Sequence, residues 1–222
     1  MRAFIRLSLS ALLATATTLG VVSTVTAADA PKSQLMNRAD LTPFGGVQSA
    51  SWGIFPLDTT VPNAICTGIK GQKIEFPKAN GWEANGQIKV TKRYAAVTEI
   101  VRDYGTQESS GQAWQALNAA AVQCPSKARD IMILGSKKSY YNVTQTQPKV
   151  AGAVTMMTRS VAVSPDKWIN GGSTADYSVY RQAGNAIVEV VYYRNPGVTV
   201  KAGTRDEVNK LSQELSARWL TN

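Results

Sequence analysis

Two cysteines constrain the fold of this chain more than any other residues. Cys66 and Cys124 are the only ones in the 222 residues, so a disulfide has one possible pairing. It would close a long loop, for which the chain-entropy treatment gives about 4 kcal/mol of stabilisation. An even number of cysteines favours a disulfide in an oxidising compartment, and two buried free thiols are the alternative. The compartment therefore decides between these two interpretations.

The N-terminus predicts export from the cell. A basic start with Arg2 and Arg6 precedes a charge-free, mostly apolar stretch from Leu7 to Val25, and Val25-Thr26-Ala27 supplies small residues for cleavage. This is the layout of a Sec-type signal peptide over residues 1–27. A permanent anchor is the alternative, but a spanning helix needs about 20 strongly apolar residues, and this stretch contains several Ser and Thr. No cysteine stands at the junction, so a lipobox anchor is not expected.

Cleavage would leave residues 28–222, which we expect to form a single domain. The formal net charge of +9 would fall to +7, because Arg2 and Arg6 leave with the signal. Lys and Arg are scattered, with no tract of five or more. We therefore predict no nucleic-acid partner and no stable membrane insertion after cleavage. The expected location is outside a Gram-positive bacterium.

The sequence contains no histidine. Ser-His-Asp and Cys-His centres and histidine-rich zinc sites are thereby excluded, and we predict neither a metal nor a cofactor. Carboxylate-pair and Ser-Lys chemistry remain. Glu99 and Asp103 share one side of a predicted strand, but at a wider separation than glycosidases use. Asp206 and Glu207 suit the start of a helix, where the dipole favours negative charge. We assign no catalytic residue.

Apolar periodicity predicts an α+β domain, an antiparallel sheet with flanking helices. Residues 52–86 are expected to be mainly irregular loops. Ser109 with Gln112, and Thr204 with Glu207, are expected to form capping boxes. The predicted helices cover residues 34–41, 110–124 and 205–220, and the predicted strands cover residues 87–91, 94–104, 139–147, 151–163, 177–182 and 186–194.

A ligand pocket is predicted from polar and aromatic residues near the ends of two strands. Arg102 and Tyr104 end one strand, and Tyr192 and Arg194 end another. If these strands are neighbours, the four side chains could line one pocket. Exposed aromatic residues commonly bind sugars or lipids, although Trp114 and Trp219 are expected in the core.

Three segments resemble a known family. They are the helix from Gly111-Gln112-Ala113-Trp114 to Gln123-Cys124, the segment Gln34 to Leu41 with Trp52, and the strand Ala186 to Tyr193 before a terminal helix. They resemble the extracellular sensor domains of actinobacterial receptor Ser/Thr protein kinases of the mycobacterial kinase H type, with their stand-alone secreted and lipoprotein relatives. The resemblance implies an antiparallel sheet, a cleft for an unidentified ligand and no catalysis. It also implies two disulfides, where this chain can form one.

The first functional hypothesis is a secreted, non-enzymatic, sensor-like protein of the bacterial cell envelope. Its ligand would be an envelope lipid, a glycan or a small molecule. A secreted inhibitor or protein-interaction module, acting on a protein partner, is the second hypothesis. A hydrolase that uses only carboxylates is the third, and two carboxylates about 5 to 10 Å apart in a pocket would favour it.

Overall fold

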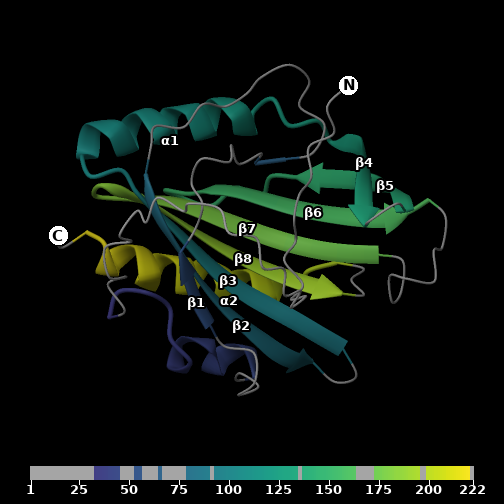
Figure 1. Cartoon of the computed structure of the whole chain (residues 1–222), viewed down its shortest axis with the longest axis horizontal. Helices are drawn as coiled ribbons and strands as arrows, with labels where there is room; N and C mark the ends of the chain where they lie inside the picture. Colours follow the sequence, from purple (N-terminus) through teal and green to yellow (C-terminus); the bar gives the residue numbers. More distant parts are fainter. Residues whose placement is uncertain are drawn as a thin grey trace, which may run out of the picture.

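One antiparallel sheet organises the molecule (Figure 1). The computed structural model describes residues 33–45, 53–56, 65–66, 79–90, 93–134, 137–163, 173–195 and 199–220. Its eight strands lie in the order β1-β2-β3-β8-β7-β6-β5-β4, and every neighbouring pair is antiparallel. The strands are β1 (Gly53–Pro56), β2 (Asn80–Val90), β3 (Arg93–Asp103), β4 (Lys127–Leu134), β5 (Lys137–Thr146), β6 (Val154–Ala162), β7 (Ser173–Ala183) and β8 (Ala186–Asn195).

The two α-helices lie on opposite sides of this sheet, as Figure 1 shows. Helix α1 (Gln107–Ala121) packs on β6, β7 and β8, and α2 (Ala202–Arg218) packs on the other side of β7 and β8. A short 3-10 helix, η1 (Ala39–Phe44), lies beside α2. The predicted α+β class and antiparallel sheet are confirmed.

The larger hydrophobic core lies between the sheet and α2. Val208, Leu211 and Leu215 of α2, with its C-cap residue Trp219, form an apolar stripe, and all four are buried. The indole of Trp219 stacks on Trp82 of β2, with ring centroids 5.8 Å apart. This contact ties the end of α2 to β2, which is far from it in the sequence.

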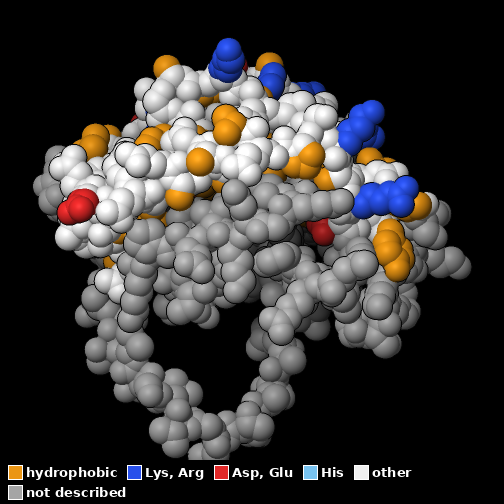
Figure 2. Space-filling view, turned by 90° about the horizontal axis from the view of Figure 1, so that it is seen from above, with side chains coloured by type: hydrophobic (Ala, Val, Ile, Leu, Met, Phe, Trp, Pro, Cys, Tyr) orange, Lys and Arg blue, Asp and Glu red, His pale blue; other side chains and the backbone are white. Residues whose placement is uncertain are grey.

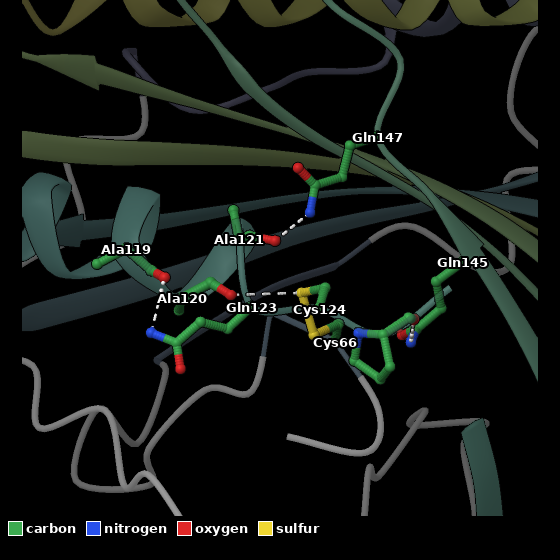
Figure 3. The surroundings of a disulfide bond; sticks show 9 residues. Cys66, Ala119, Ala120, Ala121, Gln123, Cys124, Gln145 and Gln147 are labelled. Atoms are coloured by element: carbon green, nitrogen blue, oxygen red, sulfur yellow. Dashed lines mark hydrogen bonds between the residues drawn. A yellow bond between two sulfur atoms is a disulfide. The ribbon is translucent and has the colours of Figure 1, made fainter. Parts of the chain in front are cut away.

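The predicted disulfide is confirmed (Figure 3). It joins Cys66 to Cys124, with the two Cα atoms 5.9 Å apart. Cys124 follows the last turn of α1, and Cys66 is buried in a second hydrophobic cluster with Ala113 and Leu117 of that helix. The bond therefore fastens residues 65–66 to the end of α1, as the spacing predicted.

The segment before the sheet is held against α2 and β3. Leu35, Met36 and Leu41 are fully buried. Arg218 of α2 makes two hydrogen bonds to the carboxylate of Asp40, at 2.6 and 3.0 Å. The helix predicted over residues 34–41 is wrong in type and position, because the segment forms only the 3-10 turn of η1.

Several other predicted elements differ from the structure. Strand β4 was missed, and β2 begins at Asn80 inside a region predicted as mainly loops. The N-cap of α1 is Thr106, whose Oγ1 accepts a hydrogen bond from Ser109 N, and that of α2 is Lys201, without a side-chain cap. Both predicted capping boxes are therefore wrong. The predicted signal, residues 1–27, and Trp52 lie outside the described residues.

Candidate functional site

The side of the sheet that faces α1 carries a polar cluster on β2, β3 and β8. Alternate residues of a strand point to opposite sides. Gln182 Nε2 of β7 donates to Ser110 Oγ of α1 over 3.1 Å, so the even-numbered residues of β7 face α1. The strand register then places Glu189, Arg102 and Glu83 on the same side. Three charged residues from three neighbouring strands thus share one side.

Arg102 and Glu189 form an ion pair at the centre of this cluster. Arg102 Nη1 donates to Glu189 Oε2 over 3.2 Å, and the side chains are only 10% and 7% exposed. A buried ion pair is stable only while both partners are present, because either one alone would be an uncompensated charge. Guanidinium carries five N–H donors, so this pair leaves Arg102 with donors that a ligand could use.

Burial changes the protonation of two residues near this pair. Burial raises the pKa of the Glu83 carboxyl, and the negative charge of Glu189 adds to the rise, while a hydrogen bond from Asn85 opposes it. Burial also raises the pKa of Tyr104, whose phenolic oxygen is buried without a partner among the described residues. The cluster therefore combines a fixed ion pair with a carboxyl and a phenol whose pKa values are raised by burial.

Uncharged polar side chains continue the same side of the sheet. Asn85 Nδ2 of β2 donates to Thr98 Oγ1 of β3 over 2.9 Å. Farther along the sheet, Ser178 of β7 and Thr158 of β6 are 8% and 2% exposed. Thr158 Oγ1 has no hydrogen-bond partner within the described residues. Buried polar atoms without partners are rare in folded proteins. The polar face, defined by Glu83, Asn85, Thr98, Arg102, Tyr104, Thr158, Ser178 and Glu189, is therefore a candidate binding site.

The four residues predicted to line one pocket do not meet. Their strands, β3 and β8, are neighbours, as the prediction required. Arg102 lies on the α1 side and Tyr104 packs in the α1 cluster, but Tyr192 and Arg194 lie on the α2 side. The single pocket is thus wrong, because the register puts the pairs on opposite sides of the sheet. Ligand binding by Arg102 and Tyr104 stays a prediction.

Asp103 and Glu99, two of the carboxylates considered from the sequence, make hydrogen bonds to backbone N–H groups within the fold. Asp103 Oδ1 accepts a hydrogen bond from Gly105 N over 2.8 Å in the turn before α1. Glu99 is fully buried on the α2 side, where its Oε2 accepts a hydrogen bond from Met36 N over 2.5 Å. Burial raises the pKa of Glu99 to about 7, while this hydrogen bond and Arg218 oppose the rise. Neither carboxylate belongs to the polar face.

Sequence reasoning missed Glu83 and Glu189. Glu189 interrupts the apolar run Ala186-Ile187-Val188-Glu189-Val190-Val191, and a lone charge within such a strand is a signal that was available. Glu83 lies in a stretch predicted as loop, so its strand face could not be assigned. Its nearness to Glu189 depends on the pairing of β2, β3 and β8, which residue spacing does not predict.

No group of three or more His, Cys, Asp and Glu residues in the part of the chain that the structure describes could hold a metal ion. No helix there is long and apolar enough to cross a membrane.

These features define an α+β domain with one antiparallel sheet, a helix on each side and a polar sheet face. Its fold is similar to that of the extracellular domain of PknH from Mycobacterium tuberculosis. The match has a TM-score of 0.51 and 12% sequence identity, and covers 83% of this chain and 93% of that one. Comparisons with models of known families and with curated proteins give no match. At this identity the likeness shows the fold alone.

Proposed function

We propose that this protein is a secreted, non-enzymatic, sensor-like domain that binds a ligand of the bacterial cell envelope on its polar face. One observation carries the proposal: a cluster of buried polar groups, centred on Arg102 and Glu189, lies on a sheet face where apolar packing would be expected. Likeness to an extracellular domain supports the location. The predicted signal over residues 1–27 supports it independently.

The chemistry of the polar face favours a hydroxyl-rich ligand. Hydroxyl, amide and carboxyl groups of Thr98, Asn85 and Glu83 can donate to or accept from sugar hydroxyls. The positive charge of Arg102 is balanced by Glu189, so the face offers no unbalanced cation to an anionic ligand. Among the envelope ligands predicted from the sequence, a cell-wall glycan fragment suits this set better than an anionic lipid.

Native mass spectrometry of the protein purified from culture supernatant tests this proposal. The wild type is expected to carry a bound small molecule. The double variant Glu83→Gln with Ser178→Ala should lower the fraction of protein that carries it at least tenfold. Glu214→Gln with Ser109→Ala is the matched control, because Glu214 lies on α2, on the other side of the sheet, and Ser109 lies in the first turn of α1 outside the residues that define the polar face; it should retain the ligand. Circular dichroism would establish that both variants fold.

Two outcomes would contradict ligand binding on the polar face. Equal loss of the small molecule from both double variants would place its site elsewhere. A stoichiometric protein partner in place of a small molecule would favour the interaction-module hypothesis.

A carboxylate-only hydrolase is the second candidate, because Glu83 and Glu189 lie on one side of the sheet. They are separated by β3, so their backbones are about 10 Å apart. Glu83 has the raised pKa expected of a general acid. The ion pair with Arg102 nevertheless engages Glu189. We expect no hydrolysis of chromogenic glycosides; turnover that Glu83→Gln and Glu189→Gln each abolish would establish the hydrolase instead.

A further inference from the structure

On the side of the sheet that faces away from α1, β4, β5 and β6 carry exposed side chains, among them Lys127, Arg129 and Arg159, although Thr155 of β6 is buried there. On β5, Tyr141, Val143 and Gln145 point toward the α1 side and are buried, whereas Asn142 and Thr144 point the other way and are exposed. Helix α2 packs on β7 and β8, so it covers only part of this side. An open area therefore extends from the edge of α2 to β4.

A row of cations crosses this open area. Strand register aligns Lys127 of β4 with Thr144, Arg159, Ala175 and Arg194 on the following strands. Every second strand therefore contributes a cation, and strands about 4.8 Å apart place these cations about 10 Å apart. The row with its neighbour Arg129 is named the basic strip, and its members are Lys127, Arg129, Arg159 and Arg194.

Charge is segregated between the two sides of these strands. The described residues of β4–β8 include no Asp or Glu on the side of the basic strip, whereas Asp130, Asp176 and Glu189 all lie on the α1 side. Figure 2 views the molecule from the side that carries α1, so the basic strip lies on the face turned away from the viewer; the Lys and Arg side chains visible in this view lie along its upper and right-hand edges. On the side of the strip, an anion would therefore meet positive charge with no acid on the described residues of β4–β8.

The first turns of α2 add positive charge to one end of the strip. Tyr177 of β7 donates to Asn209 of α2 over 2.8 Å. Burial raises the pKa of Tyr177 and the nearby charge of Arg205 opposes the rise, so Arg205 lies on the flank of α2 that faces β7. The Nε atoms of Arg205 and Arg194 are buried and have no hydrogen-bond acceptor among the described residues. Both residues are partly exposed, so their positive charge adds to that of the row.

The shape of this region selects a chain-like partner over a flat membrane. A helix with its side chains is about 10 Å thick, so α2 stands above the neighbouring open sheet. The exposed charged residues of α2 include Asp206, Lys210 and Glu214. A flat anionic bilayer would rest on α2 before it reached Arg159, whereas a linear polymer could lie on the strip beside the helix.

We propose that the basic strip binds a linear, phosphate-bearing polymer of the cell envelope, laid across β4 to β8 beside α2. Arginine and lysine are the common ligands of phosphate, and arginine can bind it through two parallel hydrogen bonds. The exposed hydroxyl of Thr144 lies between two cations and can donate to a phosphate oxygen. The formal net charge, +9 for the full chain and +7 once Arg2 and Arg6 leave with the predicted signal, would attract such a polymer from a distance. This site is separate from the polar face and does not depend on it.

Binding of inorganic polyphosphate to the secreted protein tests the proposal. The strip variant is Arg129→Gln with Arg159→Gln, and the control is Lys149→Gln with Lys210→Gln, which removes two exposed cations outside the strip. The strip variant should bind long-chain polyphosphate at least tenfold more weakly, and the control less than twofold. Loss of two phosphate contacts should also make the slope of log K against log salt concentration less steep, by about one to two units. Tripolyphosphate, too short to span the row, should distinguish the variants much less.

Three results would overturn the proposal. Equal weakening in the two double variants would mean that net charge alone binds polyphosphate. Tighter, strip-dependent binding to phosphatidylglycerol vesicles would identify a membrane surface. Tighter, strip-dependent binding to an oligothymidylate of equal phosphate number would identify nucleic acid.

Discussion

The two sides of the sheet carry charge in different ways. On the α1 side, Arg102 and Glu189 are buried and form an ion pair, and burial raises the pKa of Glu83. On the α2 side, Arg159 and Lys127 are exposed and have no acid near them on the described strands. Water solvates the exposed cations, so they need no partner in the fold, whereas a buried charge does. The same residue type is therefore structural on one side and free to bind a partner on the other.

Removing the buried cation should have the largest effect. Arg102→Met leaves Glu189 buried without a partner and should lower the free energy of unfolding by about 3 to 5 kcal/mol. Chemical denaturation measures this loss. The double variant Arg102→Met with Glu189→Leu should recover most of it. A loss below about 1 kcal/mol would mean that water reaches Glu189 and that the α1 side is not enclosed.

The buried carboxyl on the other side should make stability depend on pH. The pKa of Glu99 is about 7 in the folded protein and 4.5 as the ordinary value. Because the folded state holds the proton more tightly, its stability decreases as pH rises from 4.5 through 7. Asp40 and Arg218 are the charged groups near it. Glu99→Gln should match the wild type near pH 4 and be more stable by about 3 kcal/mol at pH 8.

Thermal unfolding of wild type and Glu99→Gln across this pH range measures the difference. Glu214→Gln, an exposed carboxyl on α2, is the control and should follow the wild type. Parallel curves for all three proteins would show that Glu99 is solvated and would remove the basis for its raised pKa.

A partly exposed ion pair should have an intermediate effect. The side chains of Arg218 and Asp40 are 27% and 11% exposed. Asp40→Asn should lower the free energy of unfolding by about 1 kcal/mol, because solvent screens the pair. Faster hydrogen exchange at Leu35 and Met36 is also expected, since the pair holds this segment on α2. Unchanged exchange there would mean that apolar burial alone holds the segment.

The open strip should contribute least to stability. Arg159→Met makes the same change as Arg102→Met on the opposite side of the sheet, but should shift the free energy of unfolding by no more than about 0.5 kcal/mol. Denaturation of the two variants side by side compares the faces directly. A loss at Arg159 as large as that at Arg102 would contradict the distinction between them.

The sequence predicted the regular elements better than their ends. The apolar stripe of α2 and the alternation of β3 and β8 identify their elements, because one side of each is buried. The cap of α1 was misassigned since Ser109 also fits a capping box, but the structure uses Thr106. Strand β4 was missed, because it is the edge strand at one end of the sheet and its place depends on pairing with β5, not on its own pattern.

Residue spacing alone could not predict the polar face. Arg102 and Tyr104 lie on the α1 side, whereas Tyr192 and Arg194, which were assigned to the same pocket without knowledge of the β3–β8 register, lie on the α2 side. A shift of one residue in register moves a side chain to the other side of a sheet. The disulfide was predictable, because two cysteines leave one pairing.

The most direct test of a ligand site on the polar face is an amide chemical-shift titration of the secreted protein with enzymatically released cell-wall glycan fragments. The account predicts saturable shifts at Asn85, Thr98 and Glu189, with little change at Lys127 and Arg159. Shifts confined to the basic strip, or none at saturating fragment concentration, would contradict it.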